Sequence, residues 1–176
     1  MTSIRPRPSR RPKAPPPPPL TVDRLREIGL FGALSDPALE RLTNGLAQLQ
    51  FAPGEVVFKE GDAAREMFVV LDGELEVLKH SRKGRDARVA ILGPNDAFGE
   101  ISIIDVQPRS ATVRALAPTR LLRIRTEDLD RLYRQDLKSY AIITLNVARD
   151  LSRRLRVTDG LLADFTSMVE HYGPRK

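Results

Sequence analysis

The sequence of 176 residues contains no cysteine and no tryptophan, and its only histidines are His80 and His171. Without cysteine, disulfide frameworks, thiolate metal sites and cysteine nucleophiles are excluded. Two histidines are a poor inventory for a histidine-rich metal cage or for a charge-relay triad. Kinase motifs and a glycine-rich phosphate loop are also missing. The sequence therefore predicts no metal site, no catalytic residues and no enzyme activity.

Long apolar runs are missing as well. No run approaches the roughly 18 residues that span a bilayer, and the N-terminus lacks the hydrophobic core of a secretory signal. Aromatic residues make up only 5% of the chain, but apolar residues reach 41%, which is enough for one sizeable core. The length suits one domain with some surplus. We expect a soluble, cytoplasmic protein without a membrane span.

The net charge of +6 is concentrated at the N-terminus. Residues 1–19 hold five basic side chains and no acid, whereas the rest of the chain carries 24 basic and 23 acidic side chains. The same segment contains eight of the 14 prolines, which lack the amide donor that helices and sheets need. It is predicted to be a disordered, basic, proline-rich tail, either a solvated spacer or a docking segment for a proline-reading module or an acidic surface.

Two regions with helical spacing flank a region of short strands. In residues 20–49, apolar residues recur at three- and four-residue steps that restart at Ser35-Asp36-Pro37, which predicts two short helices. In residues 51–124, short apolar or β-branched runs alternate with turn residues. Asp72-Gly73 between two such runs predicts a hairpin. Many short strands at near-regular spacing predict a closed antiparallel barrel or jelly roll.

A long helix is predicted over residues 137–169, after a shorter helical segment that begins at Thr126. Its small and apolar residues alternate steps of four and three, a heptad rhythm typical of a helix that pairs with its own copy. The alternative is a single helix packed on the barrel. We expect a homodimer, since the pattern is longer than one small barrel can cover. This heptad seam consists of Leu137, Ala141, Thr144, Ala148, Leu151, Leu155, Thr158, Leu162, Phe165 and Val169.

The most informative residues for chemistry lie between Phe98 and Val113. Here Glu100 stands nine residues before Arg109, which is followed by Ser110. Arginine suits two-point capture of a phosphate, and a hydroxyl with free backbone amides supplies further donors. A carboxylate can accept hydrogen bonds from the hydroxyls of a ribose. Together these residues predict a nucleotide with one phosphate charge, and the alternative is a surface ion pair across a loop.

The segment 98–113 resembles the phosphate-binding cassette of the cyclic-nucleotide-binding domain family, which includes bacterial catabolite activator proteins, kinase regulatory subunits and nucleotide-gated channels. Segments 52–62 and 68–77 resemble its first hairpins. The resemblance implies a mainly β fold: an antiparallel jelly roll, or double-stranded β-helix, with N-terminal helices and a long C-terminal lid helix. This domain would occupy residues 20–170 and leave a short tail at 171–176.

The resemblance also implies roles for single residues. Arg109 would pair with the cyclic phosphate of cAMP or cGMP, and Glu100 would accept from the ribose 2′-hydroxyl. On the lid helix, Thr158 is the expected contact to the base, and an alternative register one turn earlier places Arg154 there. The implied ligand-binding residues are Ile91, Gly99, Glu100, Ile101, Ser102, Arg109, Ser110, Ala111 and Thr158.

Two features of the cassette and the short segment after the long helix bear on the predicted function. Many relatives have a glycine near Val106, whose absence could stiffen the cassette loop, and Ser110 does not settle the choice of base. Activator relatives continue into a helix-turn-helix domain, whereas this sequence has seven residues after Val169, so we expect no DNA-binding domain.

The predicted function is a stand-alone cyclic-nucleotide sensor that needs no cofactor besides its ligand, cAMP or cGMP. It would transmit a conformational change to an unknown effector protein. The alternative is a ligand-free interaction or assembly module with the same fold. Nucleic-acid contact through the basic tail and the basic residues 82–88 is a secondary possibility.

Overall fold

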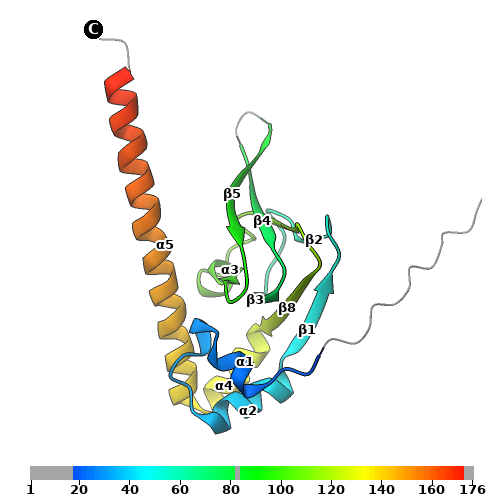
Figure 1. The fold of residues 1–176 in the computed structure, drawn as a ribbon. Helices are drawn as coiled ribbons and strands as arrows, with labels where there is room; N and C mark the ends of the chain where they lie inside the picture. The colour runs from blue at the N-terminus through cyan, green and yellow to red at the C-terminus, as the bar shows by residue number, and fades with distance from the viewer. Residues whose placement is uncertain (1–17, 82–83, 173–176) are drawn as a thin grey trace, which may run out of the picture.

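The computed structural model describes residues 18–81 and 84–172. The predicted tails therefore lie outside the described residues, except for residues 18–19 and for residues 171–172, which continue a helix. Two four-stranded antiparallel sheets form a jelly roll, with helices at its base and one long helix beside it (Figure 1). The fold class predicted from the sequence is confirmed.

The first sheet has the order β1-β8-β3-β6 and the second β2-β7-β4-β5. All pairings are antiparallel. The strands are β1 (Ala47–Phe51), β2 (Val56–Phe58), β3 (Glu66–Asp72), β4 (Leu75–His80), β5 (Asp86–Leu92), β6 (Ala97–Phe98), β7 (Thr112–Ala115) and β8 (Thr119–Arg125).

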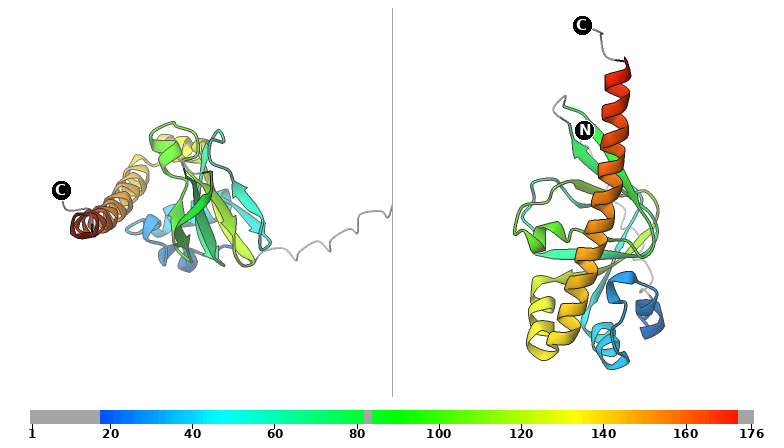
Figure 2. Two further views of the ribbon diagram at one scale, coloured as in Figure 1. Left: turned by 90° about the horizontal axis from the view of Figure 1, so that it is seen from above. Right: turned by 90° about the vertical axis from the view of Figure 1, so that its left-hand side faces the viewer.

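The helices cover the open end of the barrel and one of its sides. At the base lie α1 (Val22–Arg26), the 3-10 helix η1 (Gly29–Phe31), α2 (Asp36–Gly45) and α4 (Thr126–Gln135). In the second half of the chain, α3 (Ile101–Ile104) is a single turn in the cassette. The long helix α5 (Leu137–Tyr172) starts at the base and leans away from the barrel toward its C-terminal end (Figures 1 and 2). The long helix predicted over residues 137–169 is confirmed and extends slightly further.

Strand β3 joins the two hydrophobic cores, because successive side chains of a strand point to opposite faces. Phe68 and Val70 pack between the two sheets. Met67 and Val69 pack on the other side against the helices, where they meet Ile143 of α5. Burial on both faces makes β3 continuously apolar and fixes the register that places the neighbouring strand β6, and with it the cassette.

Two sequence predictions are wrong. Residues 47–49 belong to strand β1 instead of a helix, because Leu49 and Phe51 alternate with exposed residues and pack on the inter-sheet core. Asp72-Gly73 does not close a hairpin, since β3 and β4 lie in different sheets. Gly73 instead allows a close approach: with a φ of 94°, it sits where a Cβ would come within 2.5 Å of the Pro118 carbonyl oxygen.

Candidate functional site

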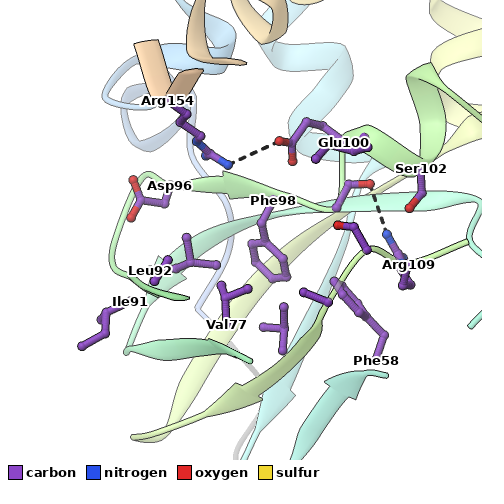
Figure 3. Close-up of a pocket in the computed structure, with 16 residues that line it drawn as sticks. Phe58, Val77, Ile91, Leu92, Asp96, Phe98, Glu100, Ser102, Arg109 and Arg154 are labelled. Atoms are coloured by element: carbon purple, nitrogen blue, oxygen red, sulfur yellow. Dashed lines mark hydrogen bonds and ion pairs between the residues drawn. The ribbon is translucent and has the colours of Figure 1, made fainter. Parts of the chain in front are cut away.

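A cavity of about 340 Å³ opens between the second sheet, the cassette and α5 (Figure 3). This volume falls in the roughly 300–1,000 Å³ range of small-ligand pockets. Its lining residues are Phe58, Val77, Ala90, Ile91, Leu92, Asp96, Phe98, Gly99, Glu100, Ile101, Ser102, Arg109, Ser110, Ala111, Val113 and Arg154. The cassette residues chosen from the sequence therefore meet in one place.

Arg109 is held in the cavity wall by glycine and by backbone contacts. Its Nη1 donates to the Gly99 carbonyl at 3.1 Å. A Cβ on Gly99 would lie 2.6 Å from the same nitrogen, and the φ of Gly99 is 78°, so the site requires glycine there. The Arg109 amide donates to the Asp62 carbonyl, and the Gly61 amide donates to the Arg109 carbonyl, both at 2.9 Å. The backbone of the turn after β2 therefore fixes the position of Arg109 in the cavity wall.

The guanidinium of Arg109 is buried, and no carboxylate among the described residues forms an ion pair with it. The residue is only 4% exposed, and its carbon centre lies 4.0 Å from the centroid of the Phe58 ring. Its Nε has no hydrogen-bond partner among the described residues. Burial lowers the pKa of Arg109, while the more distant charges of Glu66, Asp62 and Glu100 raise it. A buried cation with an unused donor is costly unless an anion binds beside it.

Glu100 precedes the single turn α3 and is also 4% exposed. Burial raises the pKa of its carboxyl. Hydrogen bonding to backbone and the charges of Arg154 and Arg109 lower this pKa, and Asp150 raises it. Because only one side chain forms an ion pair with Glu100 among the described residues, the carboxylate keeps the capacity to accept from a ligand hydroxyl.

On α5, the cavity is lined by Arg154 and not by Thr158. Arg154 Nη1 donates to Glu100 Oε1 at 3.3 Å, and Nη2 donates to the Ala97 carbonyl. Thr158 is exposed and donates to the Arg154 carbonyl one turn back. Within a single chain, Arg154 therefore lies where the alternative register places it, and the contact of Thr158 with the base stays a prediction. Thr158 lies one turn further toward the C-terminal end of α5 than Arg154, beyond the part of the helix that lines the cavity.

The other predicted site residues all line the cavity, and Ser102 is buried whereas Ile91 is half exposed. Of the apolar wall, sequence reasoning named only Ile91. Phe58 lies under Arg109, and Val77, Leu92 and Phe98 come from three different strands. In the pattern of its own strand, each of these residues looks like an ordinary core residue. Only the folding of the strands into the jelly roll brings them to one cavity.

Val106, where many relatives were expected to have glycine, has a φ of 53° and is 84% exposed. A β-branched residue in this region of φ is strained. The cassette loop therefore keeps the backbone conformation that glycine adopts freely.

Within the described residues, no helix is both long and apolar enough to cross a membrane. The same part of the chain contains no cluster of three or more histidine or acidic side chains that could hold a metal ion.

Comparisons with known proteins agree with this geometry. The family model of the cyclic nucleotide-binding domain matches residues 48–136. Over 141 residues, the chain is 31% identical to the CRP-like cAMP-activated global transcriptional regulator of Mycobacterium tuberculosis. That match covers 80% of this chain and 61% of the relative, so the chain spans less than two thirds of that protein's length.

Two solved structures have the same fold. A cyclic nucleotide-binding domain from Methylobacillus flagellatus superposes with a TM-score of 0.73 at 25% identity, with 81% of each chain covered. The Thermus thermophilus catabolite activator protein gives a TM-score of 0.69 at 29% identity, with 79% of this chain and 63% of that chain covered. These relatives are named as nucleotide-binding or regulatory proteins and not as enzymes.

Proposed function

Because the chain belongs to the cyclic nucleotide-binding domain family, we propose that it is a non-enzymatic sensor that binds cAMP or cGMP in the cavity of Figure 3. Arg109 would hold the cyclic phosphate, with Ser110 and Ala111 beside it. Glu100 would accept from the ribose 2′-hydroxyl. The purine would lie on the apolar wall that includes Ile91 and Leu92.

The observation that carries this proposal is the state of Arg109. Its guanidinium is buried and Nε has no partner among the described residues, although it lines an open cavity. A phosphate oxygen would supply the missing acceptor, and charge-assisted hydrogen bonds of this kind are strong. If position 109 served only the fold, an apolar side chain in place of Arg109 would make the protein more stable.

The alternative function is a ligand-free assembly module. Such a module gains nothing from a buried guanidinium and a buried carboxyl that share a cavity. Both groups lose hydration, and burial is the main influence on the pKa of each. A ligand that contacts both would recover this energy.

Thermal unfolding with cAMP, cGMP and their acyclic 5′-monophosphates tests the proposal. A ligand at a hundred times its dissociation constant stabilises the folded state by about 2.7 kcal/mol. We expect a cyclic nucleotide to raise the melting temperature and the acyclic forms to do so much less. If no nucleotide shifts the transition at millimolar concentration, the proposal is wrong and the assembly module is favoured.

We further propose that two chains pair through the distal half of α5. From Leu155 to Val169 every side chain is exposed, and this half stands apart from the barrel (Figures 1 and 2). Leu162 and Phe165 on the heptad seam are 61% and 64% exposed. Exposed apolar residues gathered on one face mark a surface that another protein covers, and the heptad spacing fits a second copy of the same helix.

Analytical ultracentrifugation of two matched variants tests the pairing. Leu162→Lys puts a charge on the seam, whereas Ala163→Lys puts the same charge on the exposed residue next to it. We expect the wild type and the Ala163 variant to be dimers and the Leu162 variant to be a monomer. A monomeric wild type, or equal behaviour of the two variants, would contradict pairing through the seam.

In this proposal the ligand acts by population shift. It can change the state of α5 only as far as it binds one arrangement of the helix better than another, and couplings of about 1–3 kcal/mol are usual. The structural link is Arg154, which belongs to α5 and lines the cavity. A change in α5 would then be read by an effector protein.

A further inference from the structure

A second cavity, of about 560 Å³, lies on the side of the barrel away from α5, where the end of β1 meets the start of β8 (Figure 1). It shares no lining residue with the cavity of Figure 3, and the proposed binding of a cyclic nucleotide does not use it. We call it the β1–β8 groove. Its lining includes Phe51, Pro53, Glu55, Asp72, Pro118 and Arg120.

The groove combines apolar and acidic side chains. Pro53 and Pro118 are exposed and Phe51 is half-buried, so an aromatic ring and two pyrrolidine rings line the same surface. Grooves with aromatic side chains bind polyproline segments, which lose little conformational freedom because they are already extended. Glu55 and Asp72 are exposed as well. The lining therefore suits a segment that is both proline-rich and basic.

The described part of the chain starts at the rim of this groove. The carbonyl oxygen of Pro18 accepts from Gln48 Nε2 at 3.1 Å and from Arg120 Nη1 at 3.4 Å. Arg120 also lines the groove, and its Nε donates to Asp72 Oδ2 at 2.7 Å. One guanidinium thus joins Pro18 to the groove, so the residues before Pro18 begin next to it.

The 17 residues before Pro18 have the matching composition. They include Arg10, Arg11, Lys13 and the prolines 15–17, and they contain no acid. An extended polyproline chain covers about 3.1 Å per residue, so residues 10–17 can reach about 25 Å from Pro18. Among the described lining residues, two carboxylates stand against one guanidinium. The length and the charge of the segment therefore both fit the groove.

We propose that residues 10–17 bind in the β1–β8 groove of their own chain, with the prolines on Phe51 and Pro118 and the basic side chains toward Glu55 and Asp72. This inference goes beyond the proposed function and does not depend on it. A tail held in this way is covered by its own barrel, so a proline-reading module or an acidic surface must displace it before binding. Because exposed ion pairs are screened by salt, docking should weaken as the ionic strength rises.

Paramagnetic broadening of amide signals in the full chain tests the docking. Since the sequence contains no cysteine, Ala14→Cys provides a unique attachment point for a nitroxide spin label. We expect the label to broaden the amide signals of Glu55, Asp72 and Thr119 and to leave those of residues 161–165 in α5 unchanged. Intact signals around the groove, or equal broadening in both regions, would overturn the proposal.

Two double variants of the labelled chain provide a matched comparison. Arg10→Glu with Arg11→Glu reverses two charges inside the docking segment, and Arg5→Glu with Arg7→Glu makes the same change outside it. All four residues precede the described part of the chain, so the sequence of the barrel is unchanged. We expect the broadening to disappear in the first variant and to persist in the second. Equal broadening in the two variants would contradict the proposal.

A mixed sample distinguishes the chain's own tail from the tail of a second copy. Spin-labelled chain without isotopes is mixed with isotope-labelled wild type, which has no cysteine to carry a label. We expect the signals of Glu55 and Asp72 in the wild type to stay intact. Broadening of these signals in the mixture would mean that the tail binds the groove of another copy, which overturns docking within one chain.

Discussion

Two glutamates are buried in the part of the chain that the structure describes, and their surroundings differ. Glu76 is 2% exposed and lies in the second sheet, and Glu100 is 4% exposed and lies in the cassette. The pKa of Glu76 is lowered, chiefly by the hydrogen bond from Arg114, whereas burial raises the pKa of Glu100. The two side chains are similarly shielded from solvent, but Glu76 accepts from two guanidinium groups, whereas Glu100 accepts from one and loss of hydration dominates its shift.

Glu76 has a complete set of partners from neighbouring strands. Arg114 Nε donates to Oε1 at 2.7 Å, and Arg88 Nε donates to Oε2 at 3.0 Å. Glu100 has one guanidinium at 3.3 Å and faces a cavity. Weakening one partner of a fully paired buried charge destabilises the fold, and a buried charge whose hydrogen bonds are incomplete is a candidate for ligand binding.

The largest expected effect concerns the cation of the cavity. Arg109→Met keeps a long side chain over Phe58 and removes the charge, so we expect cAMP binding to weaken by about 2–5 kcal/mol. The free energy of unfolding without ligand should not fall by more than about 1 kcal/mol, because the lost guanidinium was incompletely bonded. Calorimetry and urea unfolding measure the two effects. Arg85→Met, at an exposed position, is the control with the same change in net charge. Equal affinities for cAMP in the two variants would contradict the phosphate-binding role of Arg109.

Replacing each glutamate by glutamine tests whether Glu76 serves the fold and Glu100 serves binding. Glu76→Gln should lower the free energy of unfolding by about 1–3 kcal/mol, since it weakens two hydrogen bonds to arginines. It should leave cAMP affinity unchanged, because Glu76 does not line the cavity. Urea unfolding and calorimetry on the same sample give both values. A variant with weakened binding and unchanged stability would reverse the roles assigned to the two acids.

Glu100→Gln should show the opposite pattern. We expect affinity for cAMP to fall about tenfold, the loss of one charge-assisted hydrogen bond. Stability should stay constant or rise, because glutamine avoids the desolvation of a buried charge. Thermal unfolding without ligand and titration with cAMP check the two parts. A clear loss of stability would show that Glu100 serves the fold as Glu76 does.

The smallest effect is on pH dependence. Because a ligand hydroxyl favours the ionised form of Glu100, affinity should fall as the pH drops from neutral toward 4.5, the ordinary value for glutamate. One coupled proton limits the change to at most about tenfold per pH unit. The lowered pKa values of Glu76 and Asp128 mean that their contribution to stability is lost only as the pH falls below their ordinary values, so these two groups do not destabilise the fold in this window. Binding of 2′-deoxy-cAMP should depend less on pH, and equal profiles for the two ligands would contradict the role of Glu100.

Much of the fold can be predicted from local patterns. The strand-rich centre, the flanking helices and the long α5 follow from spacing and turn residues. The errors fall where the local pattern fits one structure and a distant contact favours another. The apolar spacing in residues 47–49 suits a helix, but these residues pair with β8 and form a strand. Asp72-Gly73 carries a hairpin signature, but Gly73 packs against Thr119 and passes the chain to the other sheet.

The candidate site was predictable only in part. Glu100 and Arg109 stand nine residues apart in a cassette whose residue types suggest their chemistry. Arg154 lies 54 residues after Glu100, and the resemblance named it only as the alternative to Thr158, because no pattern in its neighbours separates it from Arg153. Its role depends on how the proximal part of α5 packs through Ile143 and Val147 on the core, which rotates one arginine toward the cavity.

The sequence by itself determined the alternating strands, the helical periods and the charged cassette, because these depend on neighbours within a few residues. Only the tertiary structure decided which buried acid is fully paired, which arginine of α5 meets the cassette and which half of that helix is left exposed. These features depend on contacts between residues far apart in the chain, and a local pattern does not contain the geometry that brings them together.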